Sequence, residues 1–141
     1  MSKFLLTTTN RNIAAQIASL VNAGKQLYYT QTETSVINNN VRYVVELCGE
    51  QVIGVIGLEQ MSSQMTEVKH LCVHPDYRCK GLGLKLLKKG IEYATTEFVY
   101  SHVRENNVAS IKANIHAGFK PVAKYISRGR YIIIFARRRR Q

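Results

Sequence analysis

The chain has 141 residues, of which 45% are hydrophobic and 21% are charged, a balance typical of one folded domain and unlike that of a disordered chain. Its 20 Lys and Arg against 9 Asp and Glu give a formal net charge of +11, which favours an anionic partner. The apolar run near the N-terminus is too short for a signal peptide, and no apolar stretch is long enough to span a membrane. The three cysteines, Cys48, Cys72 and Cys79, lack the spacing of a zinc site or a disulfide framework. We therefore expect a cytoplasmic protein with reduced thiols, no bound metal and no membrane contact.

The first forty residues contain a strand pattern and then a helix pattern. A short apolar run predicts a strand at 4–7, and Asn10 can cap a helix that ends at Gly24, because the apolar residues between them recur at helical spacing. The segment 25–40 has a weaker pattern, for which we expect a short helix and a loop.

The rest of the chain continues to alternate between the two patterns. Runs rich in β-branched and aromatic residues predict strands at 41–48, 51–58, 65–73, 98–103, 120–125 and 131–136. Helical spacing of apolar residues predicts helices at 81–94 and 108–117, the second closed by Gly118. Because no repeat or linker interrupts the pattern, we predict one α/β domain over residues 1–136.

A basic tail is expected at 137–141, after the last predicted strand. It begins with four consecutive arginines, Arg137 to Arg140. Such a run can bind RNA phosphates, or it can be a solvated chain end. Both interpretations stay open, because a basic run is a weak signal.

The most informative stretch joins the end of a predicted strand to the start of a predicted helix. It reads Val-His-Pro-Asp-Tyr-Arg-Cys-Lys-Gly-Leu-Gly over residues 73–83. Gly81 and Gly83 have no side chain to block a ligand, and the first turn of a helix leaves N–H groups unpaired at its positive dipole end. Arg78 and Lys80 add positive charge. The stretch therefore predicts a site for an anion such as a pyrophosphate.

This stretch is similar to the acetyl-CoA-binding motif of the GNAT family of N-acyltransferases. The resemblance implies a mixed sheet of about six to seven strands flanked by about four helices, with acetyl-CoA as co-substrate. It also implies that backbone amides at the end of the strand bind the pantetheine arm, one of them polarising the thioester carbonyl, and that the glycine loop binds the pyrophosphate. The residues concerned are Leu71, Cys72, Val73, Arg78, Cys79, Lys80, Gly81, Leu82 and Gly83.

The stretch 103–119 resembles a second signature of the family, in which a strand is followed by an Asn, a short helix and a Gly-Phe pair. The resemblance places Asn107 at the cofactor, although an Asn before a helix also caps it. Asn114 stands where most members carry a Tyr that protonates the leaving CoA thiolate, and we assign it to the cofactor site. Since Asn is not a useful acid, Ser110 or a water would take that role, or the thiolate would leave unassisted.

Two residues compete as the general base that removes a proton from the attacking amine. Glu67 matches the glutamate that protein-lysine acetyltransferases of the family use. His102 lies near the position of the glutamate base in family members that acetylate N-terminal amines, and histidine titrates in a suitable range. His70 is a weaker candidate, because strand alternation would place it on the face opposite Glu67 and Leu71.

The expected function is transfer of an acetyl group to a primary amine, most simply a protein lysine or N-terminus, by direct attack in a ternary complex. A small amine or an aminoacyl-tRNA is the alternative acceptor. A non-catalytic module that binds CoA or nucleic acid also stays open, because Asn114 replaces the family's Tyr. A monomer and a homodimer are equally compatible with the sequence.

Overall fold

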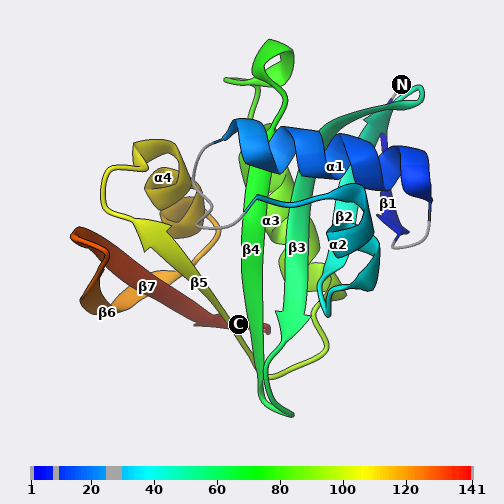
Figure 1. The fold of residues 1–141 in the computed structure, drawn as a ribbon. Coiled ribbons are helices and arrows are strands. Elements are labelled where there is room, and N and C mark those ends of the chain that lie inside the picture. Colours follow the sequence, from blue (N-terminus) through cyan, green and yellow to red (C-terminus); the bar gives the residue numbers. More distant parts are fainter. Residues whose placement is uncertain (1, 8–9, 25–29, 141) are drawn as a thin grey trace.

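A seven-stranded sheet in the order β1-β2-β3-β4-β5-β7-β6 forms the centre of the fold (Figure 1). The computed structural model describes residues 2–7, 10–24 and 30–140. The strands are β1 (Ser2–Thr7), β2 (Arg42–Cys48), β3 (Gln51–Gln60), β4 (Met65–Val73), β5 (Phe98–Arg104), β6 (Lys120–Ser127) and β7 (Arg130–Arg138). The helices are α1 (Arg11–Ala23), α2 (Glu33–Asn38), α3 (Leu82–Tyr93) and α4 (Val108–His116), with a 3₁₀ turn, η1 (Pro75–Tyr77), after β4.

All neighbouring strands are antiparallel except β4 and β5, which run parallel. The connection between these two strands carries α3 across one face of the sheet, as a parallel pair requires. Figure 1 shows α1 on the opposite face, crossing in front of β3 and β4. The sheet is therefore a middle layer between two layers of helices.

Each face of the sheet has its own hydrophobic core. The core under α3 and α4 includes Val44, Ile56, Leu58, Val68, Leu86, Leu87, Val99 and Phe135. The core under α1 and α2 includes Ile17, Val21, Val36, Tyr43, Val45 and Val55. Alternate residues of β2 and β3 belong to different cores, which explains why these strands are almost continuously apolar in sequence.

Every strand and helix predicted from residue 41 onward is present, with ends shifted by no more than two residues. β1 and α1 also confirm their predictions, and α1 is capped by the Asn10 side chain, which accepts from the N–H of Ile13. Of the weak segment 25–40, the structure shows α2, while residues 25–29 lie outside the described part of the chain. No helix in that part is long and apolar enough to cross a membrane.

The predicted basic tail is largely attached to the domain. β7 continues to Arg138, two residues beyond the predicted end, so Arg137 and Arg138 are strand residues. Arg137 Nη1 donates to the carbonyl of Ala117 at 2.6 Å, and Arg139 Nε donates to the carbonyl of Thr96 at 3.0 Å. Arg138 pairs with Glu97 at 3.4 Å. These contacts hold the arginine run against the ends of α4 and β5.

Candidate active site

A pocket of about 260 Å³ opens where β4 and β5 separate. The two strands are paired over three positions only, from Met65 opposite Phe98 to Glu67 opposite Tyr100. Figure 1 shows them meeting near the C-terminal end of the chain and then spreading apart. Beyond Glu67 the β5 side of β4 has no strand partner within the described chain, so backbone groups at this edge face the gap.

The pocket passes through the sheet from one face to the other. Val21 of α1 lines it on one side, and Leu87 of α3 lines it on the other. The remaining lining residues are Ile56, Glu67, Val68, Lys69, His70, Leu71, Cys72, Ser101, His102, Val103, Arg104, Asn107, Ser110 and Asn114. A ligand on the α3 face and a ligand on the α1 face can therefore meet inside it.

The wall on the α3 and α4 side is a buried polar network around Asn114, a residue that is 1% exposed. Its Oδ1 accepts from the Ser101 hydroxyl at 2.7 Å, and its Nδ2 donates to the carbonyl of Ser110 at 2.8 Å. Asn107 caps α4, since its Oδ1 accepts from the N–H of Ser110 at 3.2 Å. Asn114 thus ties β5 to α4, and both Ser110 and Asn114 line the pocket.

The start of α3 is built differently from the starts of the other helices. Side chains of Asn10, Thr32 and Asn107 cap α1, α2 and α4, whereas Gly81 at the start of α3 offers no side-chain cap. The first N–H groups of α3 therefore lack a side-chain acceptor, which is the arrangement that binds anions.

The loop before α3 has room for a ligand. Gly81 has a φ of 76° and Cys79 a φ of 63°, both in the left-handed region. A Cβ on Gly81 would meet nothing within 4 Å, and one on Gly83 would meet only Val73 at 3.9 Å. Because the protein leaves this space empty, the glycines at 81 and 83 fit the close approach of a phosphate. Arg78 and Lys80 are exposed beside it.

The side chain of Cys72 faces the α1 core, where a Cβ on Gly24 would lie 3.3 Å from its Sγ. Burial raises the pKa of the Cys72 thiol to about 11, against the opposing effect of Arg78. The thiol is therefore protonated and serves as an apolar group in the wall.

The pocket wall on the α1 and α2 side carries charged groups. Lys69 Nζ lies 2.7 Å from Glu59 and 3.9 Å from Glu67. Burial, and then the negative charges of Glu67 and Glu59, raise the pKa of Tyr100 on β5. Glu67 is therefore on the face of the sheet that also carries Glu59 and Lys69.

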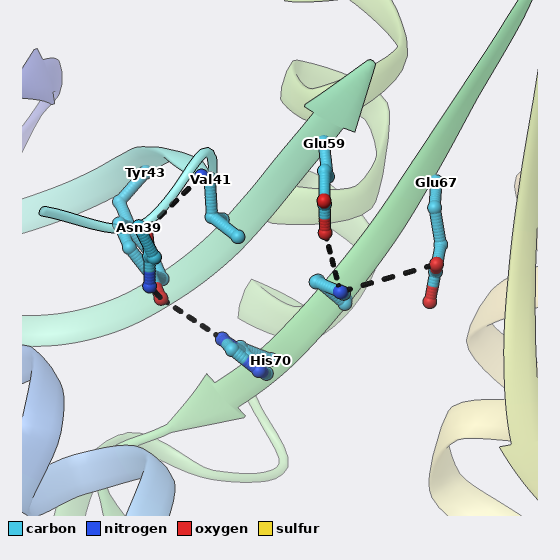
Figure 2. A network of polar contacts seen from close by, with 7 residues as sticks. Asn39, Val41, Tyr43, Glu59, Glu67 and His70 are labelled. Carbon is cyan, nitrogen blue, oxygen red and sulfur yellow. Dashed lines mark hydrogen bonds and ion pairs between the residues drawn. The ribbon is translucent and has the colours of Figure 1, made fainter. Parts of the chain in front are cut away.

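His70 lies on this same face, so the prediction that it points away from Glu67 was wrong. The pairing of β3 with β4 slips between Val55 and Gly57, and His70 has a φ of 56°. This bulge inserts one extra residue and reverses the alternation after Lys69. His70 Nδ1 is 3.0 Å from the Tyr43 hydroxyl, under α1 and α2 (Figure 2). The other half of the prediction holds, because Leu71 packs against the core on the α3 face.

The second candidate base, His102, is exposed on β5 and also lines the pocket. Its Nδ1 lies 2.7 Å from the Tyr125 hydroxyl of β6. The pocket thus brings together all three predicted catalytic residues, Glu67, His102 and Ser110. Of the predicted cofactor residues, it includes Leu71, Cys72, Asn107 and Asn114, whereas Val73 and the loop 78–83 lie outside it, along the path from β4 into α3.

The sequence did not reveal which residues form hydrogen bonds and ion pairs with the predicted site residues. Glu59, Lys69 and Tyr43 looked like ordinary strand residues, and Ser101 had no distinguishing neighbour. The one available signal was Gly57, where a Cβ would lie 2.6 Å from Val41 and 3.3 Å from Tyr43. A glycine in an apolar strand marks a close approach, but it does not say which side chain approaches.

Comparison with known proteins identifies the family. Residues 10–119 match the model of the acetyltransferase (GNAT) family, and the chain therefore belongs to that family. It is accordingly an acetyl-CoA-dependent acetyltransferase. No curated protein sequence matches it significantly.

Solved structures share the fold at low sequence identity. The yncA protein of Salmonella typhimurium, solved with its cofactor acetyl-CoA, has a TM-score of 0.79 and 18% identity, over 96% of this chain and 93% of that one. A mutant of spermidine N-acetyltransferase SpeG from Vibrio cholerae has a TM-score of 0.77 and 15% identity, over 98% and 94%. Arabidopsis thaliana NAA60, in complex with a bisubstrate analogue, has a TM-score of 0.77 and 16% identity, over 98% of both chains.

Proposed function

We propose that the protein acetylates a primary amine of a protein or peptide, with acetyl-CoA entering from the α3 face and the amine entering from the α1 face. The observation that carries this proposal is the pocket that crosses the sheet between β4 and β5. It is lined by Leu87 on one side and by Val21 on the other. The two substrates then meet in line, which is what direct attack needs.

The residues on the α3 side fit acetyl-CoA. The uncapped start of α3 and the open space at Gly81 and Gly83 suit the pyrophosphate. The edge of β4 at Leu71 to Val73, which has no strand partner in the described chain, suits an extended pantetheine arm, and a backbone N–H there would polarise the thioester carbonyl. Bound acetyl-CoA supplies the activated acyl carbon, and the rest of the chemistry is movement of protons.

Glu67 is the base that we propose for the acceptor amine. A lysine amine, with a pKa of about 10.4, is mostly protonated near neutral pH, so a carboxylate can both bind the ammonium and take its proton. Glu67 lies on the acceptor side of the pocket, with Lys69 Nζ 3.9 Å from its carboxylate. His102, paired with Tyr125, is the alternative base.

Ser110 is the acid that we propose for the departing CoA thiolate. Asn114 cannot take this role, because its amide is already occupied by Ser101 and Ser110 and is fully buried. Ser110 lines the pocket on the cofactor side. A thiol with a pKa of about 8.5 is a tolerable leaving group, so this assistance is modest.

The charge of the pocket favours a peptide over a polyamine. Among the described lining residues, Glu67 is the only carboxylate, and Lys69 and Arg104 are cations. Lys69 is itself paired with Glu59 at 2.7 Å. A polycation such as spermidine would therefore find one carboxylate on the lining for its several charges, whereas a peptide with one amine needs only one.

Mass spectrometry of three peptides tests the proposal. One peptide has a free N-terminus and no lysine, the second has a blocked N-terminus and one lysine, and the third has both amines blocked. We expect acetylation of at least one of the first two, with matching release of CoA thiol, and none of the third. If neither free amine is acetylated and no CoA is released, the proposed function is wrong.

A further inference from the structure

A chain of hydrogen bonds leads from the backbone just before β2 to the imidazole of His70 (Figure 2). The N–H of Val41 donates to Asn39 Oδ1 at 3.0 Å, and Asn39 Nδ2 donates to the Tyr43 hydroxyl at 3.1 Å. The Tyr43 hydroxyl is 3.0 Å from His70 Nδ1. The direction of each hydrogen bond determines which atom is the donor in the next one.

The direction of the chain follows from its first bond. A backbone N–H can only donate, so the atom of Asn39 beside Val41 is the amide oxygen, and the atom beside Tyr43 is the amide nitrogen. The Tyr43 hydroxyl therefore accepts from Asn39 and has its own proton to give. Tyr43 is fully buried, and burial raises its pKa, so the phenol keeps that proton. Its remaining partner, His70 Nδ1, receives it.

Consequently, one tautomer of His70 is selected. Burial, followed by the charge of Lys69 and opposed by Glu59, lowers the pKa of His70 to about 4, so the ring is neutral at physiological pH. A neutral imidazole whose Nδ1 accepts must carry its proton on Nε2. This Nε2–H points away from Tyr43, because the two ring nitrogens project from opposite sides of the imidazole.

The surroundings hold the ring in this orientation. The Tyr43 and His70 rings are stacked, with centroids 5.9 Å apart and planes 18° apart. Gly57 of β3 pairs with Tyr43 and leaves the space that the Tyr43 ring uses, since a Cβ there would be 3.3 Å from Tyr43. The bulge at His70, with its φ of 56°, turns the side chain toward the acceptor face. His70 also lines the pocket, on the side where we place the acceptor substrate.

We propose that His70 selects the acceptor, and that its Nε2–H donates a hydrogen bond to a carbonyl oxygen next to the amine that is acetylated. The acceptor class is then a peptide α-amine, whose carbonyl oxygen lies two carbons from the nitrogen. A lysine ε-amine and a polyamine have no oxygen so close. His70 is a hydrogen-bond donor in this account, and the base is another residue. This proposal rests on the proposed function and adds the class of amine.

The tautomer is tested directly by NMR of ¹⁵N-histidine-labelled protein. The chain has four histidines, and the His70→Asn variant identifies the signal of His70. We expect a protonated Nε2 and an unprotonated Nδ1 from neutral pH down to about pH 5, given the pKa of about 4. A proton on Nδ1, or a doubly protonated ring at neutral pH, would overturn the proposal without touching the proposed function.

The role in selection is tested with two acceptors that differ in one group. The first is a short peptide with a free α-amine, and the second carries an (E)-alkene in place of its first peptide bond. His70→Asn is the matched variant, because Asn tolerates the positive φ and its Oδ1 can still accept from Tyr43, while no donor remains at the position of Nε2. Acetyl-CoA affinity, measured on both proteins, controls for folding.

We expect the ratio of kcat/KM for the peptide to that for the alkene to fall about tenfold in His70→Asn, the size of one good hydrogen bond. An unchanged ratio would overturn the role of His70 while leaving the acetyltransferase intact. Acetylation of a lysine peptide but not of the α-amine peptide would also overturn it. If the wild type acetylates no peptide at all, both proposals fail.

Discussion

The two sides of the pocket are assembled in different ways. The cofactor side comes from two short stretches of chain, 71–83 and 107–114, and its key features are helix starts and glycines. The acceptor side joins side chains from four separate segments, through the Asn39–Tyr43–His70 chain and the ion pairs of Lys69 with Glu59 and Glu67. The cofactor side therefore depends on local conformation, and the acceptor side depends on how three strands align.

Because the two sides are built differently, we expect each side to determine the specificity for a different substrate. Backbone amides at a helix start bind any ligand with the right phosphate, so that side fixes the co-substrate. Polar side chains at fixed positions in a pocket orient what enters it, so that side can set acceptor specificity. Variants on the two sides should accordingly change different kinetic constants.

The largest expected effect is on the acceptor side, at Glu67. Glu67→Gln removes the proposed base and should lower kcat by about 10²–10⁴-fold, while acetyl-CoA affinity stays the same. Glu59→Gln is the matched control, since it removes the other carboxylate beside Lys69, and a much smaller loss is expected. Steady-state kinetics at saturating acetyl-CoA measure both. If Glu67→Gln kept full activity while His102→Gln lost it, His102 would be the base instead of Glu67.

A second prediction concerns pH and the buried His70. Its pKa falls from 6.5 in the unfolded chain to about 4 in the folded protein. The unfolded state therefore binds a proton first as pH falls, so stability is full above pH 6.5 and is lost between about pH 6.5 and 4. The loss from this group approaches about 3 kcal/mol. Urea unfolding across this range measures the free energy of unfolding at each pH. Its decrease with falling pH should be clearly smaller in His70→Asn. Equal decreases would show that His70 is not buried as described.

A smaller effect is expected on the cofactor side, at Asn114. Asn114→Ala leaves the buried Ser101 hydroxyl without its acceptor and should lower the free energy of unfolding by about 1–3 kcal/mol. Ser110→Ala keeps the Ser110 carbonyl, which is the main partner of Asn114, and should cost less. Thermal unfolding of the two variants distinguishes them. If Asn114→Ala were as stable as the wild type, the tie between β5 and α4 would carry no stabilisation.

The same contrast explains how far the sequence could predict the structure. The strands and helices beyond residue 40 were predictable because their patterns are local, and so were the glycine loop and the Asn107 cap. The bulge at His70 was not, because it depends on how β4 aligns with β3, and one inserted residue reversed the predicted face of that side chain. The contacts of Arg137 and Arg139 with carbonyls of distant segments were equally invisible in a run of four arginines.

The most direct test of the account is calorimetric titration of acetyl-CoA into the wild type and into the Gly81→Glu, Gly83→Glu double variant. The glutamates would place side chains and negative charge in the space kept for the pyrophosphate. Gly129→Glu is the matched control, because Gly129 also has a positive φ, 75°, and nothing within 4 Å of its Cβ, but it lies in the turn between β6 and β7. We predict micromolar binding by the wild type and by Gly129→Glu, and none by the double variant. Failure of the wild type to bind, or binding by the double variant as tight as that of the control, would contradict the cofactor site.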